Sequence, residues 1–254
     1  PDSLSRRDVC GKAKTGSGKT LAFGIPCVQL MSKAQPGRPT ALALVPTREL
    51  AVQVCAELEP LAAVRGLRVQ AIYGGAPIEK QIAALNKGVE FIVATPGRLI
   101  DLIERKEVSV AALELVIVDE ADRMADMGFM PQVEWVLRGV EGEHQTMLFS
   151  ATLDGMVGSL ISRYQTDPAM HEVAYEEVSV KEMQHRFLTV HEMDRIKVAA
   201  TIINASNRTI VFSRTKWGAD KLAAKLNDAG VSAAPIHGDL RQSQREKSLK
   251  DFAS

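Results

Sequence analysis

The chain alternates short apolar runs with longer segments in which apolar residues recur at helical spacing. Most of the short runs are continuously apolar rather than alternating with polar residues. This is typical of strands that are buried on both faces of a parallel sheet. In the first part of the chain, the runs predict strands at Val9–Ala13, Ala41–Val45, Arg68–Tyr73, Phe91–Ala94, Leu115–Val118 and Thr146–Phe149.

The segments between these strands predict helices. The range Arg48–Leu61 shows the pattern most clearly, because Leu50, Val54, Leu58 and Leu61 recur on one face. Strands that alternate with helices predict an α/β fold, with a doubly wound parallel sheet covered by helices.

The alternation is interrupted at Ala174–Lys181, where the sequence AYEEVSVK is polar and has no helical stripe. We predict an interdomain linker there, which leaves residues 1–173 as the first domain and 182–254 as part of a second. Because an open strand edge is a poor place for a domain to end, we expect this second domain to be truncated. Its predicted strands are Arg186–Val190, Thr209–Ser213 and Ser232–Ile236, and its predicted helices are Asp194–Ile203, Lys216–Ala229 and Ser243–Phe252.

Charge and cysteine content narrow the class of protein. The 31 basic residues equal the 31 acidic ones, which argues against a histone-like binder but still allows a local basic track. No apolar run approaches the roughly 20 residues that span a bilayer, and the start does not resemble a signal peptide. Cys10, Cys27 and Cys55 are widely spaced and form no CxxC zinc pair. We therefore expect reduced thiols, a cytoplasmic location and no association with membranes.

Residues 13–20 read AKTGSGKT and link the first predicted strand to a helix. This is the Walker A spacing, with alanine in place of its first glycine. Glycines let backbone N–H groups face phosphate oxygens, and the helix N-terminus adds partial positive charge. We expect Lys19 to reach the β- and γ-phosphates and Thr20 to ligate Mg²⁺. The predicted nucleotide-binding residues of this loop are Ala13, Lys14, Thr15, Gly16, Ser17, Gly18, Lys19 and Thr20.

The loop has a structural alternative, a Gly/Ser turn that merely starts a helix. The preceding strand, the following helix and the GKT triplet together favour a phosphate site.

A second group of polar residues follows the apolar strand at Leu115–Val118, which runs directly into Asp119, Glu120, Ala121 and Asp122. Unpaired buried carboxylates are costly, but at the carboxyl end of a parallel strand they face the crevice where ligands bind. We predict that Asp119 contacts Mg²⁺ directly or through water, and that Glu120 orients and deprotonates the attacking water. The alternative, a solvated acidic turn, is disfavoured by the Walker A loop in the same chain.

Asp119–Asp122 read DEAD, and several other short motifs accompany them in a fixed order. Together they resemble the motif set of the DEAD-box RNA helicases, over nearly the whole chain. The matching motifs are Ala13–Thr20, Pro46–Leu50 (PTREL), Gly74–Gly75, Thr95–Arg98 (TPGR), Ser150–Thr152 (SAT), Val211–Thr215 (VFSRT), and His237–Asp239 with Gln242 and Arg245.

This resemblance implies two RecA-like domains that close over ATP and RNA. It implies that Asp122, Ser150 and Thr152 couple the nucleotide state to domain closure. The catalytic residues that it implies are Lys19, Asp119, Glu120, Ser150 and Thr152. The residues that it places at the RNA sugar and phosphate groups, without sequence preference, are Pro46, Thr47, Arg48, Gly74, Gly75, Thr95, Pro96, Gly97, Arg98, Arg214, Gln242 and Arg245.

The implied activity is that of an ATP-dependent RNA helicase that uses ATP and Mg²⁺ to grip RNA and unwind short duplexes. An ATP-gated RNA clamp shares every motif and stays open as an alternative. The DEAD, PTREL, GG and TPGR motifs argue against a DNA-translocating motor. The second α/β unit and the SAT triplet argue against a nucleotide kinase.

The resemblance also carries an expectation about the limits of the chain. The family's adenine-recognising glutamine motif precedes the point that corresponds to Pro1, and its arginine finger follows the point that corresponds to Ser254. We therefore expect residues 1–254 alone to be inactive in unwinding.

Overall fold

The computed structural model describes residues 1–13, 16–173 and 184–253. By its internal contacts the chain divides into two compact units, Pro1–Tyr175 and Glu176–Ser254. The predicted linker Ala174–Lys181 lies outside the described residues, and so do Lys14 and Thr15 of the phosphate loop.

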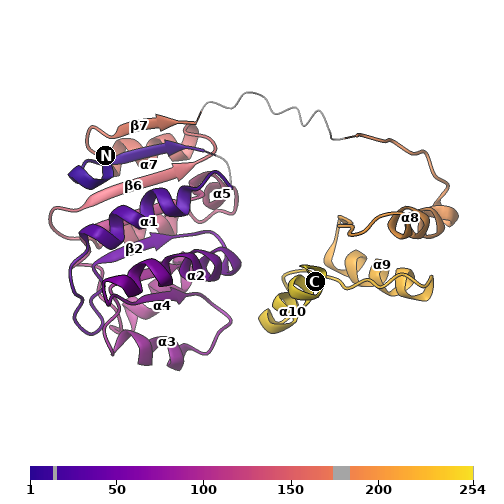
Figure 1. Cartoon of the computed structure of the whole chain (residues 1–254), viewed down its shortest axis with the longest axis horizontal. Helices are drawn as coiled ribbons and strands as arrows, with labels where there is room; N and C mark the ends of the chain where they lie inside the picture. Colours follow the sequence, from indigo (N-terminus) through magenta and orange to yellow (C-terminus); the bar gives the residue numbers. More distant parts are fainter. Residues whose placement is uncertain (14–15, 174–183, 254) are drawn as a thin grey trace. The chain divides into compact units, whose positions relative to one another are not determined.

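The first unit is built on a seven-stranded parallel sheet in the order β3-β4-β2-β5-β6-β1-β7 (Figure 1). The predicted doubly wound α/β fold is confirmed, and the six strands predicted in this unit all form. The edge strand β7 was not predicted, because three of its four residues are exposed and it has no apolar run. The strands are β1 (Val9–Lys12), β2 (Ala41–Leu44), β3 (Val69–Ile72), β4 (Phe91–Ala94), β5 (Leu115–Asp119), β6 (Gln145–Ser150) and β7 (Ala169–Glu172).

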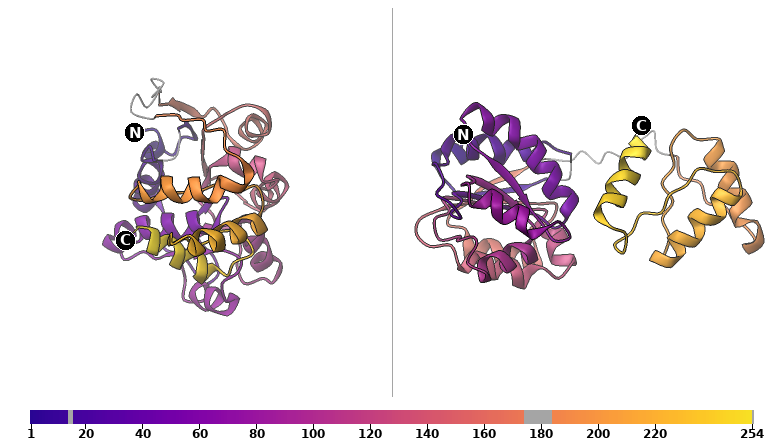
Figure 2. Two further views of the ribbon diagram at one scale, coloured as in Figure 1. Left: turned by 90° about the vertical axis from the view of Figure 1, so that its right-hand side faces the viewer. Right: turned by 90° about the horizontal axis from the view of Figure 1, so that it is seen from below.

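Helices cover both faces of this sheet, which the view from below shows (Figure 2). One face packs against α1 (Lys19–Leu30) and α2 (Arg48–Val64). The other face packs against α3 (Ile78–Leu85), α4 (Pro96–Glu104), α5 (Ala121–Asp126), α6 (Met130–Arg138) and α7 (Gly155–Tyr164).

A short 3₁₀ turn, η1 (Ser3–Ser5), precedes β1. Among the described residues, no helix is both long and apolar enough to span a membrane.

The central strands explain the continuous apolar runs. Successive side chains of a strand point to opposite faces, so a strand between two helical layers needs apolar residues at every position. In β2, Leu42 and Leu44 enter the core beneath α3–α7, whereas Ala41 and Ala43 enter the core beneath α1 and α2. All four side chains are fully buried.

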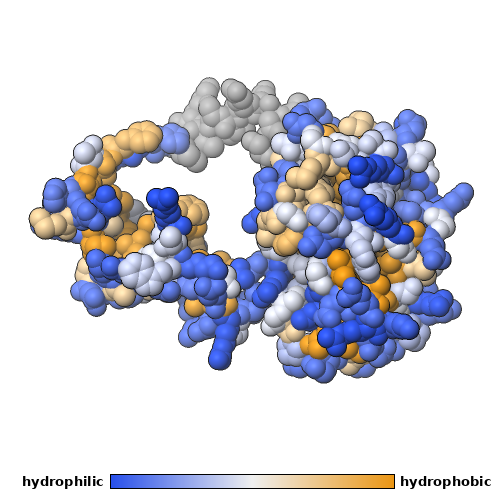
Figure 3. Space-filling view, turned by 180° about the vertical axis from the view of Figure 1, so that it is seen from behind, coloured by the Kyte–Doolittle hydropathy of each residue, from blue (hydrophilic) through white to orange (hydrophobic). Residues whose placement is uncertain are grey.

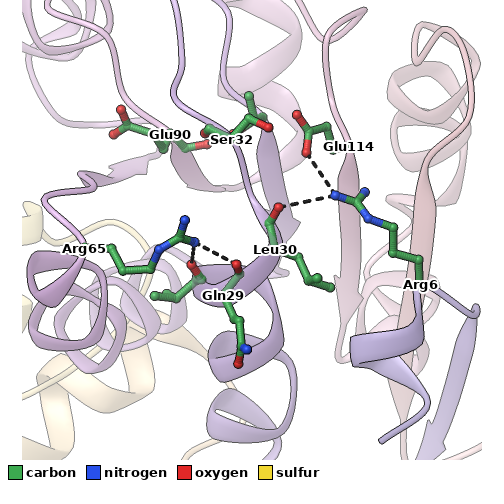
Figure 4. A network of polar contacts seen from close by, with 9 residues as sticks. Arg6, Gln29, Leu30, Ser32, Arg65, Glu90 and Glu114 are labelled. Atoms are coloured by element: carbon green, nitrogen blue, oxygen red, sulfur yellow. Dashed lines mark hydrogen bonds and ion pairs between the residues drawn. The ribbon is translucent and has the colours of Figure 1, made fainter.

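The far end of α1 is fixed by two arginines (Figure 4). Arg65 donates to the carbonyls of Val28 and Gln29, with the second bond at 2.8 Å. Arg6 donates to the Leu30 carbonyl at 3.3 Å and lies 3.5 Å from the Glu114 carboxylate. Helix carbonyls at a C-terminus lack intrahelical partners and carry partial negative charge, so these cations stabilise that end. These contacts hold α1 in place, and the first residue of α1 is Lys19.

Residues 184–253 of the second unit include three α-helices: α8 (Arg195–Asn204), α9 (Lys216–Asp228) and α10 (Gln242–Ala253). A 3₁₀ turn, η2 (Glu192–Asp194), precedes them. The three predicted helices form, with ends shifted by at most one residue. Their buried core consists of Ala200, Leu226 and Val231.

The three strands predicted in the second unit are wrong, because residues 186–190, 209–213 and 232–236 form no sheet. A strand persists only when its N–H and C=O groups pair with a neighbour and its side chains are covered. Here Phe187 and Phe212 are 95% and 92% exposed. The space-filling view shows apolar surface on this unit (Figure 3).

Candidate active site

The motifs of the first unit meet at one edge of its sheet. All strands run parallel, so their carboxyl ends lie along the same edge. β5 and β1 flank β6, with Asp119 opposite Phe149 and Lys12 opposite Ser150. The phosphate loop after β1, the acidic stretch after β5 and the SAT triplet after β6 are therefore neighbours.

The described part of the phosphate loop is open above its backbone. Gly16 and Gly18 have φ of 84° and 83°, in the left-handed region that favours glycine. A Cβ built on either residue would meet nothing within 4 Å. Gly18 is the N-cap residue of α1 and, within the described part of the loop, makes no side-chain capping bond to that helix. The N–H groups of the first helical turn can therefore bind an anion that enters this space.

Lys19 is a buried cation beside the acidic stretch. Its Nζ lies 3.5 Å from Asp119 Oδ1 and donates to the Ala13 carbonyl at 3.3 Å. The Lys19 and Asp119 side chains are only 9% and 4% exposed. Burial raises the pKa of the Asp119 carboxyl, and the nearby Lys19 charge acts in the opposite direction.

These residues fit Mg·ATP. A buried ammonium at the base of an open glycine loop suits phosphate oxygens, and the half-buried Thr20 hydroxyl and the Asp119 carboxylate are the hard oxygen donors that Mg²⁺ prefers. The Glu120 N–H donates to Asp119 Oδ1 at 2.9 Å, which holds that carboxylate at the strand end.

The last residue of the acidic stretch is tied to β6. The Asp122 N–H donates to Ser150 Oγ at 3.1 Å, and the Ala151 N–H donates to Asp122 Oδ2 at 3.3 Å. Ser150 is fully buried, and Thr152 is exposed just beyond it. A shift of the acidic stretch would therefore move the start of the SAT triplet.

The other predicted contact residues lie at the carboxyl ends of β2, β3 and β4. Thr47 caps α2, and its hydroxyl accepts from the Leu50 N–H at 3.2 Å. The Arg48 guanidinium lies against Gly75, where φ is 88° and a Cβ would overlap Arg48 Nη1. Arg98 Nη1 donates to the Ala76 carbonyl at 3.2 Å. Two arginines from different helices thus converge on one glycine loop.

Pro46, Gly74, Thr95, Pro96 and Gly97 complete this region. Thr95 is the N-cap residue of α4, and Pro96 is its first residue. PTREL and TPGR therefore each also contain the start of a helix, α2 and α4.

In the second unit, Thr215 caps α9 and accepts from the Gly218 N–H at 2.9 Å, with Arg214 exposed just before it. Arg245 Nη1 donates to Gln242 Oε1 at 3.4 Å, so this predicted pair does come together within α10.

Arg123 lies at the site but was not among the residues predicted from the sequence. Arg123 lies one helical turn after Glu120, and its Nη1 is 3.0 Å from Glu120 Oε2. The available signal was a cation three residues after the proposed base, a spacing at which helical side chains meet.

Comparison with known proteins places these motifs in context. The profile of the DEAD/DEAH box helicase family matches residues 1–158, and that of the helicase conserved C-terminal domain matches residues 193–254. The chain is 43% identical over 99% of its length to a protein of Geobacillus kaustophilus named DEAD-box ATP-dependent RNA helicase CshA, covering 54% of that protein. The Bacillus subtilis protein of the same name is 41% identical, with 51% of its length covered.

The chain therefore spans about half the length of these curated relatives. Among solved structures, it is similar to a DEAD box protein from the hyperthermophile Methanococcus jannaschii, with 34% identity and a TM-score of 0.62. That match covers all of this chain and 68% of the other.

Proposed function

Because this chain belongs to the DEAD/DEAH box helicase family, we propose that it provides the ATP site and part of the RNA-binding surface of an RNA-dependent ATPase that unwinds short duplexes. One observation carries the proposal. A buried Lys19–Asp119 pair and a second cluster of Arg48, Gly75 and Arg98 lie at the carboxyl edge of a single sheet.

In the ATP site, Lys19 and the N–H groups at the start of α1 bind the phosphates, while Thr20 and Asp119 would hold Mg²⁺. The bound ion supplies charge neutralisation for the phosphates. Glu120 orients a water molecule and accepts its proton as the water oxygen bonds to the γ-phosphorus and the bond from that phosphorus to the β,γ-bridging oxygen breaks, which releases ADP. Because Lys19 and Asp119 are buried, their electrostatic interactions with the phosphates and Mg²⁺ are stronger than they would be in water.

On the RNA side, Arg48 and Arg98 provide fixed positive charges, and Thr47 and Thr95 provide hydroxyl groups. Contacts of these types reach phosphates and ribose rather than base edges, so they do not select a sequence. Arg214, Gln242 and Arg245 of the second unit would extend the same kind of grip. Asp122, Ser150 and Thr152 would transmit the nucleotide state from the acidic stretch to the rest of the protein.

The proposal is tested by comparing single-stranded RNA with single-stranded DNA as activators of ATP turnover in the full-length protein. We expect RNA of any sequence to stimulate turnover at least about tenfold more than DNA, since contacts with the 2′-hydroxyl distinguish the two. Equal stimulation by DNA would contradict the proposal. A strand-separation assay in the same reactions then separates an unwinding enzyme from an ATP-gated clamp, which would turn over ATP without releasing a strand.

Gly75→Ala tests the RNA surface. The substitution forces a side chain into a backbone with φ of 88° and into the space of the Arg48 guanidinium. We expect RNA affinity, measured by fluorescence anisotropy, to fall about tenfold, which corresponds to one charge-assisted contact. ATP affinity should not change, because Gly75 follows β3, the outermost strand on one side of the sheet, whereas the ATP site lies at β1, β5 and β6.

Gly142→Ala is the matched control. Gly142 also has a positive φ, 78°, but a Cβ there would meet nothing within 4 Å, and the residue precedes β6 at the opposite edge of the sheet. It imposes similar backbone strain without displacing Arg48. If both variants lost RNA affinity equally, the effect would come from backbone strain and not from the proposed surface.

A further inference from the structure

Glu120 has an unusual backbone for its residue type. Its φ and ψ are 51° and 49°, in the left-handed region, and it is the N-cap residue of α5. Residues other than glycine adopt this conformation only when their surroundings fix it, and such residues cluster at functional sites. Its side chain is 8% exposed and makes no capping bond to the helix.

That side chain is instead bound by Arg123. The distance from Arg123 Nη1 to Glu120 Oε2 is 3.0 Å, the range of a charge-assisted hydrogen bond. The Arg123 side chain is 57% exposed, whereas the Glu120 side chain is only 8% exposed. The contact therefore reaches from solvent into the ATP site. In an ordinary surface ion pair, by contrast, both side chains are exposed.

The three carboxylates of the acidic stretch are held in different ways. Asp119 Oδ1 accepts from the Glu120 main-chain N–H and also lies 3.5 Å from Lys19 Nζ, and Asp122 Oδ2 accepts from the Ala151 main-chain N–H. Glu120 Oε2 accepts from a side chain. Main-chain donors survive substitution by any residue except proline, but the Arg123 contact depends on the identity of residue 123.

We propose that Arg123 is a positioning residue for ATP hydrolysis, which holds the Glu120 carboxylate in the orientation needed to accept a proton from water. This inference rests on the proposed role of Glu120 as the general base. A glutamate side chain has several rotatable bonds, and a bond to one carboxylate oxygen removes most of that freedom before the substrate arrives. A group fixed in this way acts through another residue and does not itself touch the substrate.

The inference predicts a split between turnover and binding. In the full-length protein, Arg123→Ala should lower kcat for RNA-stimulated ATP hydrolysis about tenfold, because a misplaced catalytic group loses rate steeply. KM for ATP and the affinity for RNA should stay within about twofold, since Arg123 has no role in binding either ligand. Arg123→Lys retains a cation within reach of Oε2 and should recover part of the lost rate.

Arg138→Ala is the matched control. Arg138 Nη2 lies 3.0 Å from Glu134 Oε2 in α6. The variant therefore removes a contact of the same type and the same length, but outside the ATP site. Its kcat should equal that of the wild type. If Arg123→Ala also retained the wild-type kcat, or raised it, the positioning role would be overturned.

A double variant keeps the two proposals separate. Adding Arg123→Ala to Glu120→Gln should cause no further loss of turnover, because the carboxylate that Arg123 positions is already gone. An additional loss of several-fold would overturn the inference, since Arg123 would then act independently of Glu120. Turnover by Glu120→Gln at the wild-type rate would instead overturn the proposed function itself.

Discussion

Replacing Glu120 with glutamine should leave ATP and RNA bound to the full-length protein while turnover falls about 10³-fold, the range that one general base contributes. Glutamine keeps the size of the side chain and removes the charge and the basic oxygen. Lys19 and Asp119 stay in place, so the phosphates and Mg²⁺ would still have their ligands. The measurement is steady-state release of inorganic phosphate with saturating RNA.

Binding should be measured in the same variant, because loss of turnover alone would also follow from a damaged site. We expect the ATP dissociation constant to stay within about threefold of the wild-type value. Glu143→Gln serves as the control for removal of a carboxylate, since Glu143 is exposed in the loop before β6. If Glu120→Gln retained turnover within a few-fold of the wild type, another group would have to activate the water.

The fold of the first unit could be predicted because its physical signal is local. A strand between two helical layers is apolar at every position, and β2, β4 and β5 have that pattern. β7 lacks the signal, because as an edge strand it buries only Ala169. The second unit shows the opposite failure. Ile210, Val211 and Phe212 have the composition of a strand, but their main chain pairs with no neighbour in the described structure and their side chains are exposed.

The site shows the same division between local and long-range information. That Lys19 and Asp119 meet follows from the rule that ligand-binding residues gather at the carboxyl ends of parallel strands. The contact of Arg48 with Gly75 does not follow from that rule. It depends on the strand order, which places β2 and β3 on either side of β4. The Arg123–Glu120 contact was within reach of sequence reasoning, but the same spacing occurs in many ordinary surface ion pairs. What distinguishes this pair is the burial of Glu120, which only the structure gives.

The same burial leads to the second large effect, which is expected for Lys19→Ala. The variant removes the charge of a side chain that is only 9% exposed. That charge faces the open glycine loop. A charge-assisted contact is worth roughly 1.5–3 kcal/mol, so ATP affinity should fall by a factor of about 10 to 100. Isothermal titration with Mg·ATP measures this directly, and it can be done on residues 1–254.

The control for loss of a lysine is Lys12→Ala. Lys12 lies at the end of β1, one residue before the loop begins, and pairs with Glu172 at 2.6 Å, with 41% and 61% of the two side chains exposed. Exposed ion pairs contribute roughly 0–1 kcal/mol to stability and are screened by salt, so Lys12→Ala should leave ATP affinity unchanged. Equal loss in both variants would point to a general change of charge near β1 and would remove the case for Lys19 as a phosphate ligand.

Lys19→Ala should also affect stability, and this must be separated from its effect on binding. Without Lys19, the buried Asp119 carboxylate loses an opposing charge, so its already raised pKa should rise further. A carboxyl whose pKa is higher in the folded than in the unfolded state favours folding when protonated, so the variant should become less stable as pH rises through the folded-state pKa. Adding Asp119→Asn removes the buried charge and should restore the thermal midpoint at neutral pH. It should not restore ATP affinity, because the ammonium that binds phosphate is still absent. Recovery of affinity in the double variant would show that Lys19 acts by neutralising Asp119 and not by binding ATP.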